Sequence, residues 1–346
     1  MRVGVVGAGV IGCAVAERLQ RGGHQVTVYE RDRVGAHASG AAAGLLAPYS
    51  ESRKSGGTSP LGRAGQSPSP RPPPLLDAGA RSLRLFPELA ARLLAETGID
   101  VQFHDMDSLT PAFDPEEEAL LKRAGGRWLD AFELRGLEPG LHPDCRGAVL
   151  FPESQVTPPL LTRALAQAAV QRGAELREGV RITSPSDLEP ADVVVLAAGP
   201  WSADLGASFG IEIPVWPSRG QLVRLRPAPG HRDPLTRMLT HHGRYLVPKP
   251  DGAIVAGSTE EEVGFDARPT ADGVRGLLDF ARRMVPALGA ATVEEVWAAL
   301  RPATADGEPI IERRGERLVV ATGHNRNGIL LAPITAERVA ELVGAG

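Results

Sequence analysis

The chain has 346 residues, of which 42% are hydrophobic and 23% charged, and its net charge is −4. This length predicts two domains, and the slightly acidic charge excludes a basic surface for nucleic acid. No apolar run is long enough to span a bilayer. Two distant cysteines, Cys13 and Cys145, argue against a disulfide scaffold or a cysteine zinc site. A strand that begins at residue 2 leaves no room for a signal peptide, so we expect a cytoplasmic protein.

The first 30 residues have the pattern of a β-α-β unit. A buried strand at 2–6 (RVGVV) is followed by GAGVIG at 7–12, an alanine-rich helix from about Ile11 to Gln20, and a second strand at 25–29. This order predicts a parallel sheet, because a crossover helix joins strands that run in the same direction.

The GAGVIG stretch fits the dinucleotide-binding fingerprint. Gly7, Gly9 and Gly12 would permit a tight turn, close approach of backbone to a pyrophosphate, and close packing of helix on strand. Glu30 ends the second strand at the spacing expected for an acid that binds the ribose, which disfavours NADP. The alternative is a structural turn with a surface glutamate.

The middle of the chain combines helices with one polar stretch. Residues 50–74 hold almost no apolar side chains, which predicts a disordered insertion or, alternatively, a mobile lid over an active site. Helical periodicity covers 75–97, with a break expected at Pro87, and 116–123 also has a helical pattern. A helix over 158–172 begins with proline and ends before a glycine.

The second half changes from parallel to antiparallel patterns. Strands are predicted at 174–182 and 191–197, and from about residue 214 alternation and turn signals indicate an antiparallel sheet. A helix at 271–285, a buried strand at 317–321 and a helix at 332–344 complete the chain. We therefore expect an α/β fold with two discontinuous domains. The FAD-binding domain would comprise 1–90, 144–213 and 301–346, and the substrate domain 91–143 and 214–300.

Three features favour FAD over NAD, which the glycine motif alone does not separate. The small-residue run at 38–46 (ASGAAAGLL), with one hydroxyl at Ser39, lets a long cofactor lie on the backbone. The stretch 194–202 ends a strand in small residues, and nucleotide-binding segments recur near the C-terminus. An extended FAD contacts several separated segments, whereas a simple NAD domain is one contiguous block.

Five stretches in this order carry a family resemblance: GAGVIG, SGAAAGLLAP, AAGPWS, WAALRPATADGEPII and GHNRNGILLAP. The chain resembles the glycine oxidases of thiamine biosynthesis, within the D-amino-acid-oxidase-like family of FAD-dependent oxidoreductases. The resemblance covers most of the chain. It implies a glutathione-reductase-like FAD domain of Rossmann type, an antiparallel substrate domain, non-covalent FAD, and a homo-oligomer, specifically a tetramer. Residues 50–74 depart from the family pattern.

The resemblance also implies the site residues. The substrate carboxylate would be bound by Arg301, Arg326 and Tyr245; local alternatives are pairing of Arg301 with Asp306, a surface ion pair for Arg326, and a core position for Tyr245. FAD would be bound by the following residues: Gly7, Gly9, Val10, Ile11, Gly12, Glu30, Arg31, Ala38, Ser39, Ala43, Gly44, Leu45, Val180, Gly199, His324, Asn325, Arg326, Asn327, Gly328, Ile329 and Leu330. Residues 324–330 would wrap the flavin, with backbone N–H groups stabilising the negative charge of its reduced form.

The implied reaction is oxidation of glycine or another small amine by hydride transfer to flavin, with O2 as electron acceptor and hydrogen peroxide as product. No side chain is clearly the base that deprotonates the amine, and His241 and His242 are expected at the surface. A D-amino acid oxidase and a quinone-linked D-amino acid dehydrogenase are the alternative enzymes. The alternative outside catalysis is a protein that holds FAD without turnover.

Overall fold

The computed structural model describes residues 1–50, 73–230 and 233–344. The insertion predicted at 50–74 therefore falls outside the described residues, except that Ser50 is buried and Pro73 begins a helix. Within the described ranges, no helix combines the length and the apolar character needed to cross a bilayer.

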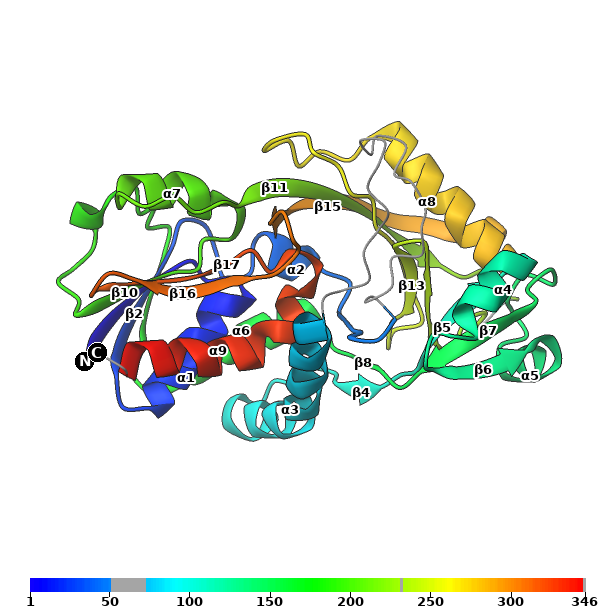
Figure 1. Ribbon diagram of the computed structural model, residues 1–346, viewed down its shortest axis with the longest axis horizontal. Coiled ribbons are helices and arrows are strands. Elements are labelled where there is room, and N and C mark those ends of the chain that lie inside the picture. The colour runs from blue at the N-terminus through cyan, green and yellow to red at the C-terminus, as the bar shows by residue number, and fades with distance from the viewer. Residues whose placement is uncertain (51–72, 231–232, 345–346) are drawn as a thin grey trace.

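A six-stranded sheet forms one half of the molecule (Figure 1). All neighbouring strands are parallel except the first pair, which is antiparallel. The strands in sheet order are β16 (Ile310–Arg314), β17 (Leu318–Thr322), β10 (Val193–Leu196), β1 (Arg2–Val6), β2 (Gln25–Glu30) and β9 (Glu175–Glu178). The predicted β-α-β unit and its parallel sheet are thus confirmed.

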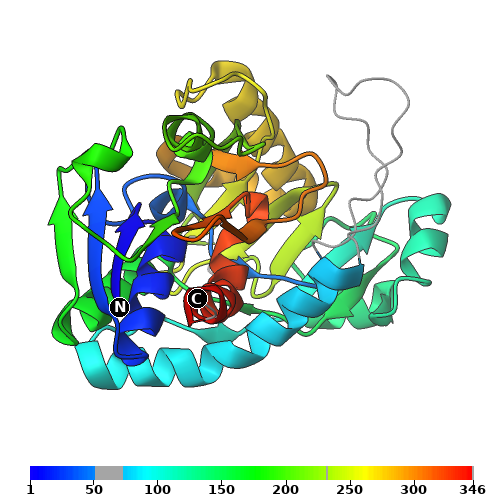
Figure 2. The ribbon, with the colours of Figure 1, turned by 60° about the vertical axis from the view of Figure 1, so that its left-hand side comes forward.

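Helices cover both faces of this sheet. Valines at alternate positions of β1, β10 and β17 point into the larger core, which the helices α1, α3, α6 and α9 complete. The intervening residues face α7 on the other side. These helices are α1 (Val10–Arg21), α3 (Pro73–Thr97), α6 (Pro158–Gln171), α7 (Ser202–Ser208) and α9 (Gly328–Gly344). Figure 2 shows α3 extending along the same side of the sheet as α1 and α9.

An eight-stranded sheet forms the other half, and its longest strands, β11 and β15, extend toward the first sheet (Figure 1). Its strands in sheet order are β15 (Thr292–Ala303), β11 (Trp216–Arg226), β14 (Ile254–Gly257), β13 (Arg244–Pro248), β12 (Met238–His241), β5 (Ser108–Ala112), β7 (Gly147–Phe151) and β6 (Arg127–Asp130). Its helices are α4 (Pro115–Leu121), α5 (Ala131–Leu137) and α8 (Ala271–Met284). A small sheet joins the halves through β3 (Leu45–Leu46), β8 (Ser154–Gln155) and β4 (His104–Asp105). Short turns are α2 (Ala38–Ala41), η1 (Pro185–Asp187), η2 (Gly199–Trp201), η3 (Pro286–Ala290) and η4 (Asn325–Asn327).

Three predicted elements differ from the structure. The break expected at Pro87 is wrong, because α3 continues through it while Phe86 and Leu93 remain in the core. A proline removes one helical hydrogen bond, and packing on both sides of it offsets that loss. The last helix begins at Gly328 rather than at residue 332, and β9 covers only part of the strand predicted at 174–182.

The predicted division into domains remains a prediction, but the strands bear on its boundaries. β7 belongs to the eight-stranded sheet although its residues fall in the range 144–213 assigned to the FAD domain. β15 likewise extends three residues beyond position 300. The parallel strands nevertheless come from the start, middle and end of the chain, and the antiparallel strands lie between them in sequence, as the pattern indicated.

A buried ion pair joins α3 to α1 and gives a test of this packing. The Glu17 side chain is 4% exposed, and its Oε1 lies 2.5 Å from Nη1 of Arg92. Replacing Arg92 with methionine leaves that carboxylate without its nearest cation, so we expect a loss of about 3 kcal/mol in the free energy of unfolding. Urea unfolding of the purified protein would measure it.

The matched control is Arg282→Met, which removes an exposed arginine that lies 3.9 Å from Asp279 on α8. It should change the free energy of unfolding by no more than about 0.5 kcal/mol. Adding Glu17→Gln to Arg92→Met should recover part of the lost stability. Equal effects of the two arginine substitutions would contradict a structural role for the buried pair.

Candidate active site

The loop between β1 and α1 requires its glycines. Gly7 has a φ of +106°, and a Cβ there would lie 2.4 Å from the carbonyl oxygen of Ala197. A Cβ on Gly12 would lie 1.9 Å from the carbonyl oxygen of Gly7, and Gly9 caps α1. The first turn of α1 has no acidic residue, so its N-terminal amides and helix dipole favour an anion such as a pyrophosphate.

Glu30 is fixed beside this loop as a hydrogen-bond acceptor. Its carboxylate is buried and accepts from the backbone N–H of Ala8 at 2.8 Å and from that of Asp32 at 3.0 Å. Each carboxylate oxygen has a further lone pair, which suits ribose hydroxyls. The next residue, Arg31, places its guanidinium carbon 3.6 Å from the centroid of the Trp201 ring.

A cavity of about 1190 Å³, including open solvent at its mouth, lies where the parallel strands end. Its lining comes from separated segments of the chain, as an extended dinucleotide requires, and from both large sheets. The predicted cofactor-binding residues that line it are Gly7, Gly9, Val10, Ile11, Ala38, Ser39, Ala43, Gly44, Leu45, Gly199, His324, Asn325, Arg326, Gly328 and Ile329.

The small-residue run that lines this cavity is held in place by side chains of the other sheet. Nζ of Lys249 donates to the carbonyl oxygen of Ala43 at 2.7 Å, and Nε1 of Trp297 donates to that of Ala41 at 2.9 Å. Burial lowers the pKa of Lys249 to about 8, despite a second hydrogen bond from Nζ to Oε1 of Gln155. The cofactor side of the cavity is therefore positioned in part by residues from β15 and from the end of β13.

The turn between β17 and α9 brings the N-terminus of α9 to the cavity. His324 is fully enclosed, its Nε2 lies 2.9 Å from Oγ1 of Thr335, and burial lowers its pKa to about 3. Asn325 has a φ of 45°, and its buried Oδ1 has no hydrogen-bond partner within the described ranges. A bound donor group would satisfy that oxygen, and the amides from Gly328 onward would favour negative charge. The residues present therefore fit a flavin dinucleotide.

The three residues predicted to bind a carboxylate line the same cavity. Nη2 of Arg301 donates to Oγ of Ser258 at 2.6 Å, and Nη1 donates to the carbonyl oxygen of Thr259 at 3.2 Å. The guanidinium carbon of Arg326 lies 5.7 Å from the centroid of the Tyr245 ring. Two cations and a phenol in one half-buried space suit a small anionic group.

Two glycines make room for these side chains. A Cβ on Gly220 would lie 1.9 Å from Nη2 of Arg301, and a Cβ on Gly257 would lie 2.6 Å from the ring of Tyr245. Both glycines are in strands, where glycine often marks close approach of another group. Arg301 and Tyr245 can therefore occupy these positions only because β11 and β14 have glycines, without side chains, beside them.

Six predicted cofactor residues are not in the cavity wall: Gly12, Glu30, Arg31, Val180, Asn327 and Leu330. Gly12 packs against the carbonyl oxygen of Gly7, and Glu30 accepts from the backbone N–H of Ala8, so both hold the glycine loop in place. Val180 is exposed, and its backbone N–H donates to the carbonyl oxygen of Glu30. Leu330 is in the core of the half that contains the six-stranded sheet, and its carbonyl accepts from Ser82. Their direct contact with a cofactor remains a prediction.

The sequence did not single out several residues that line the cavity. Ser258 and Gly220 become neighbours of Arg301 only because β11 pairs with both β14 and β15. Trp201 and His37 also line it, with their ring centroids 4.7 Å apart. The only local signal was the tryptophan in AAGPWS, which ends a small-residue strand.

The described geometry agrees with comparisons against known proteins. A model of the FAD dependent oxidoreductase family (DAO) matches residues 2–342. A glycine oxidase of Bacillus licheniformis is 32% identical, over 98% of this chain and 92% of the relative. A bifunctional protein ThiO/ThiG of Synechocystis is 35% identical, over 98% of this chain but only 51% of the relative.

The fold of the chain is also that of a solved relative. The crystal structure of glycine oxidase from Geobacillus kaustophilus superposes with a TM-score of 0.88 at 35% identity, and the match covers 99% of this chain and 95% of that one. The Rossmann-type sheet with an antiparallel second sheet is therefore shared across the entire match.

The buried histidine beside the cavity predicts a contribution to acid lability. His324 has a pKa of about 3 in the folded chain, and an unfolded histidine has a pKa of about 6.5. Below pH 6.5 the unfolded chain therefore binds the extra proton, and folding stability falls as the pH is lowered toward 3. Between pH 7.5 and 5 this group should account for a loss of about 2 kcal/mol.

His324→Gln should reduce that loss, as measured by urea unfolding at both pH values with saturating FAD. His142→Gln is the control, because that half-buried histidine lies in a different loop, between α5 and β7. Identical pH dependence in the His324 variant and the unaltered protein would contradict this interpretation.

Proposed function

The chain belongs to the family of FAD dependent oxidoreductases, and on that premise we propose that it oxidises glycine, with other small amines or D-amino acids as lesser substrates. Bound FAD supplies a two-electron acceptor for hydride. The products are the imine, which hydrolyses to glyoxylate and ammonia, and hydrogen peroxide once O2 takes the electrons. The ThiO/ThiG similarity supports a role in the thiazole branch of thiamine biosynthesis.

The observation that carries the proposal is the convergence of Arg301, Arg326 and Tyr245 on the cavity that also contains the glycine loop and the N-terminus of α9. A protein that only stored FAD would have no need for two cations beside a phenol at that place. An amino acid carboxylate bridges these groups with charge-assisted hydrogen bonds, which fixes the direction of its Cα–H bond.

Arg301 is preorganised for this task. Its guanidinium is held by Ser258 and by the carbonyl of Thr259, and the missing side chain at Gly220 gives it space. Little side-chain freedom is lost on binding, because the fork is already oriented by the protein. Arg326 comes from the turn that precedes α9, so the clamp links residues of both halves of the molecule.

The amine must lose a proton before hydride leaves. No aspartate or glutamate lines the cavity in the described part of the chain. His324 is committed to Thr335, and burial keeps its ring neutral. We infer that two nearby guanidinium groups and exclusion of water lower the amine pKa, so that solvent accepts the proton during binding.

A cytoplasmic tetramer is part of the proposal by family resemblance, and gel filtration would test its assembly.

The first test is anaerobic reduction of the bound flavin. The FAD-containing protein should lose its oxidised flavin absorbance when glycine is added without oxygen, and air should restore it with formation of peroxide. Bleaching by bulkier D-amino acids but not by glycine would reject glycine as the substrate. Reoxidation by a quinone but not by O2 would instead indicate a dehydrogenase.

The second test addresses the carboxylate clamp. Arg301→Ala should weaken glycine binding roughly 10- to 100-fold, because it removes charged hydrogen bonds, while FAD absorbance is retained. Rapid-mixing measurement of flavin reduction against glycine concentration would give the dissociation constant. An unchanged constant in an FAD-loaded variant would sink the assignment.

Two controls make this test specific. Arg282→Ala removes an exposed arginine of α8 and should leave glycine binding unaltered. An amine that lacks a carboxylate should be oxidised equally slowly by the unaltered protein and by Arg301→Ala, since neither can use the clamp with it.

A further inference from the structure

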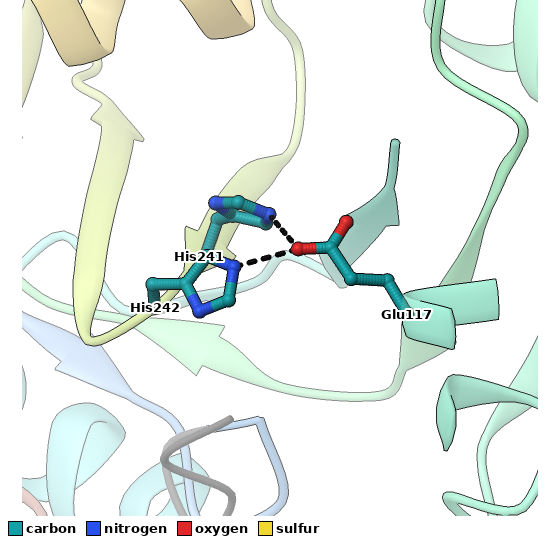
Figure 3. Close-up of side chains that lie close together, drawn as sticks. All are labelled: Glu117, His241 and His242. Atoms are coloured by element: carbon teal, nitrogen blue, oxygen red, sulfur yellow. Dashed lines mark hydrogen bonds and ion pairs between the residues drawn. The ribbon is translucent and has the colours of Figure 1, made fainter. Parts of the chain in front are cut away.

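A second group of polar side chains lies in the eight-stranded half, apart from the cavity (Figure 3). It consists of Glu117 in α4 and the adjacent residues His241 and His242 at the end of β12. None of the three lines the cavity described above. The surface position expected for the histidine pair is half wrong, since His241 is buried and only the His242 side chain is 39% exposed.

The turn after β12 brings both imidazoles to one place. His241 pairs with Arg244 in register, and the two residues between them, His242 and Gly243, have φ values of 48° and 75°. Consecutive side chains of a regular strand point to opposite faces, whereas this left-handed turn lets neighbouring rings converge. Their centroids lie 4.0 Å apart with the ring planes nearly perpendicular.

One carboxylate oxygen faces both rings. Oε1 of Glu117 lies 3.2 Å from Nε2 of His241 and 2.6 Å from Nε2 of His242. The other oxygen, Oε2, accepts from the backbone N–H of Phe113 at 2.7 Å. That hydrogen bond fixes the carboxylate plane and leaves Oε1 directed at the imidazoles, as an outer-shell contact does for a metal ligand.

The three atoms are close enough together to bind a single ion once Oε1 of Glu117 moves slightly away from His242. They all lie within 4.8 Å of one another. Metal bonds of about 2.0–2.1 Å in tetrahedral geometry place ligand atoms about 3.3 Å apart. Two imidazoles and one carboxylate are typical of zinc, cobalt, nickel or copper, whereas calcium and magnesium prefer oxygen ligands. The His242 side chain is partly exposed, and a water would complete the fourth position of a tetrahedral site.

The cluster combines one carboxylate with a nearby cation. Burial, followed by the charges of His242 and Arg283, lowers the pKa of His241 to about 4. The pKa of Glu117 is also lowered: burial raises it, but the Phe113 amide and the two histidines lower it more. Arg283 of α8 opposes a cation here, since it lies over the Phe113 ring and its charge reaches His241. A site with one carboxylate beside an arginine disfavours calcium and magnesium, which proteins bind mainly through several oxygen ligands.

We propose that Glu117, His241 and His242 form a binding site for a divalent transition metal ion such as zinc. The site is on the face of the sheet opposite to the active-site cavity, because His241 shares its face with Arg244 and not with Tyr245. A bound ion ties α4 to the turn that leads into β13, three residues before Tyr245. The proposal does not depend on the substrate or on the reaction.

A different histidine–carboxylate cluster is a poorer candidate. Glu30, Asp32 and His37 also lie close together. Arg31 already donates to Asp32 at 3.0 Å and contacts Nε2 of His37 at 3.1 Å. A guanidinium therefore occupies the position that a metal ion would need, and this cluster belongs to the cofactor side of the cavity.

The test measures zinc bound to the FAD-containing, untagged protein. After treatment with chelator, the protein is equilibrated with Zn²⁺, and zinc and flavin are quantified in the same sample. We expect one equivalent of zinc per chain, lost in His242→Asn and in Glu117→Gln. Both cysteines are buried, so thiolates do not provide a competing surface site. The flavin content of each variant reports that it has folded.

Two matched controls complete the design. Glu116→Gln changes the exposed neighbour of Glu117 on the same helical turn, and His142→Asn changes another histidine whose ring lies near that of Phe113. Both should keep the bound zinc, and zinc should raise the thermal midpoint of the controls but not of His242→Asn. Absence of bound zinc in the unaltered protein, or equal zinc in the ligand variants and the controls, would overturn the proposal.

Discussion

The architecture depends on a backbone contact that tolerates no side chain. Gly7 follows β1, and Ala197 follows the neighbouring parallel strand β10. A Cβ on Gly7 would collide with the backbone of Ala197, so the chain can leave both strands here only with glycine at position 7. The same place is the N-terminus of α1, whose first turn contains no acidic residue. Because carboxyl ends of parallel strands share one edge, the chain after β17 arrives at that edge as well. Anion binding is thus a property of the sheet topology, and the nearby side chains refine it.

The eight-stranded sheet contributes to the cavity in two ways. Lys249 and Trp297 hold carbonyl groups of the run at 41–43, while β15 carries Arg301 to the cavity. The cavity wall at 41–43 and the proposed carboxylate clamp therefore depend on the same contacts between the two halves. A displacement of β15 would alter both together, which suits a reaction whose geometry must be kept within fractions of an ångström.

Local signals predicted the β-α-β unit, the glycine loop and the arginines, because each has its cause within a few residues of sequence. The continuous helix through Pro87 was missed because its support comes from core contacts of Phe86 and Leu93 with distant helices. Ser258 and Gly220 were missed for a similar reason: their contacts with Arg301 arise from strand pairing across tens of residues. The convergence of Glu117 with His241, 124 positions later, has no local signature at all.

The strand order also bears on how the protein forms during synthesis. β1 and β2 precede β10 in the chain, yet the other edge of β1 pairs with β10, and β10 in turn pairs with the still later strand β17. Contacts between such distant residues form slowly, since long loops must close before they stabilise the fold. β1 therefore keeps one edge unpaired until β10 has been made, and such an edge is prone to wrong pairing in the nascent chain. The turn before α9 follows the other segments that line the cavity, so the cavity wall is complete only once that turn has been made.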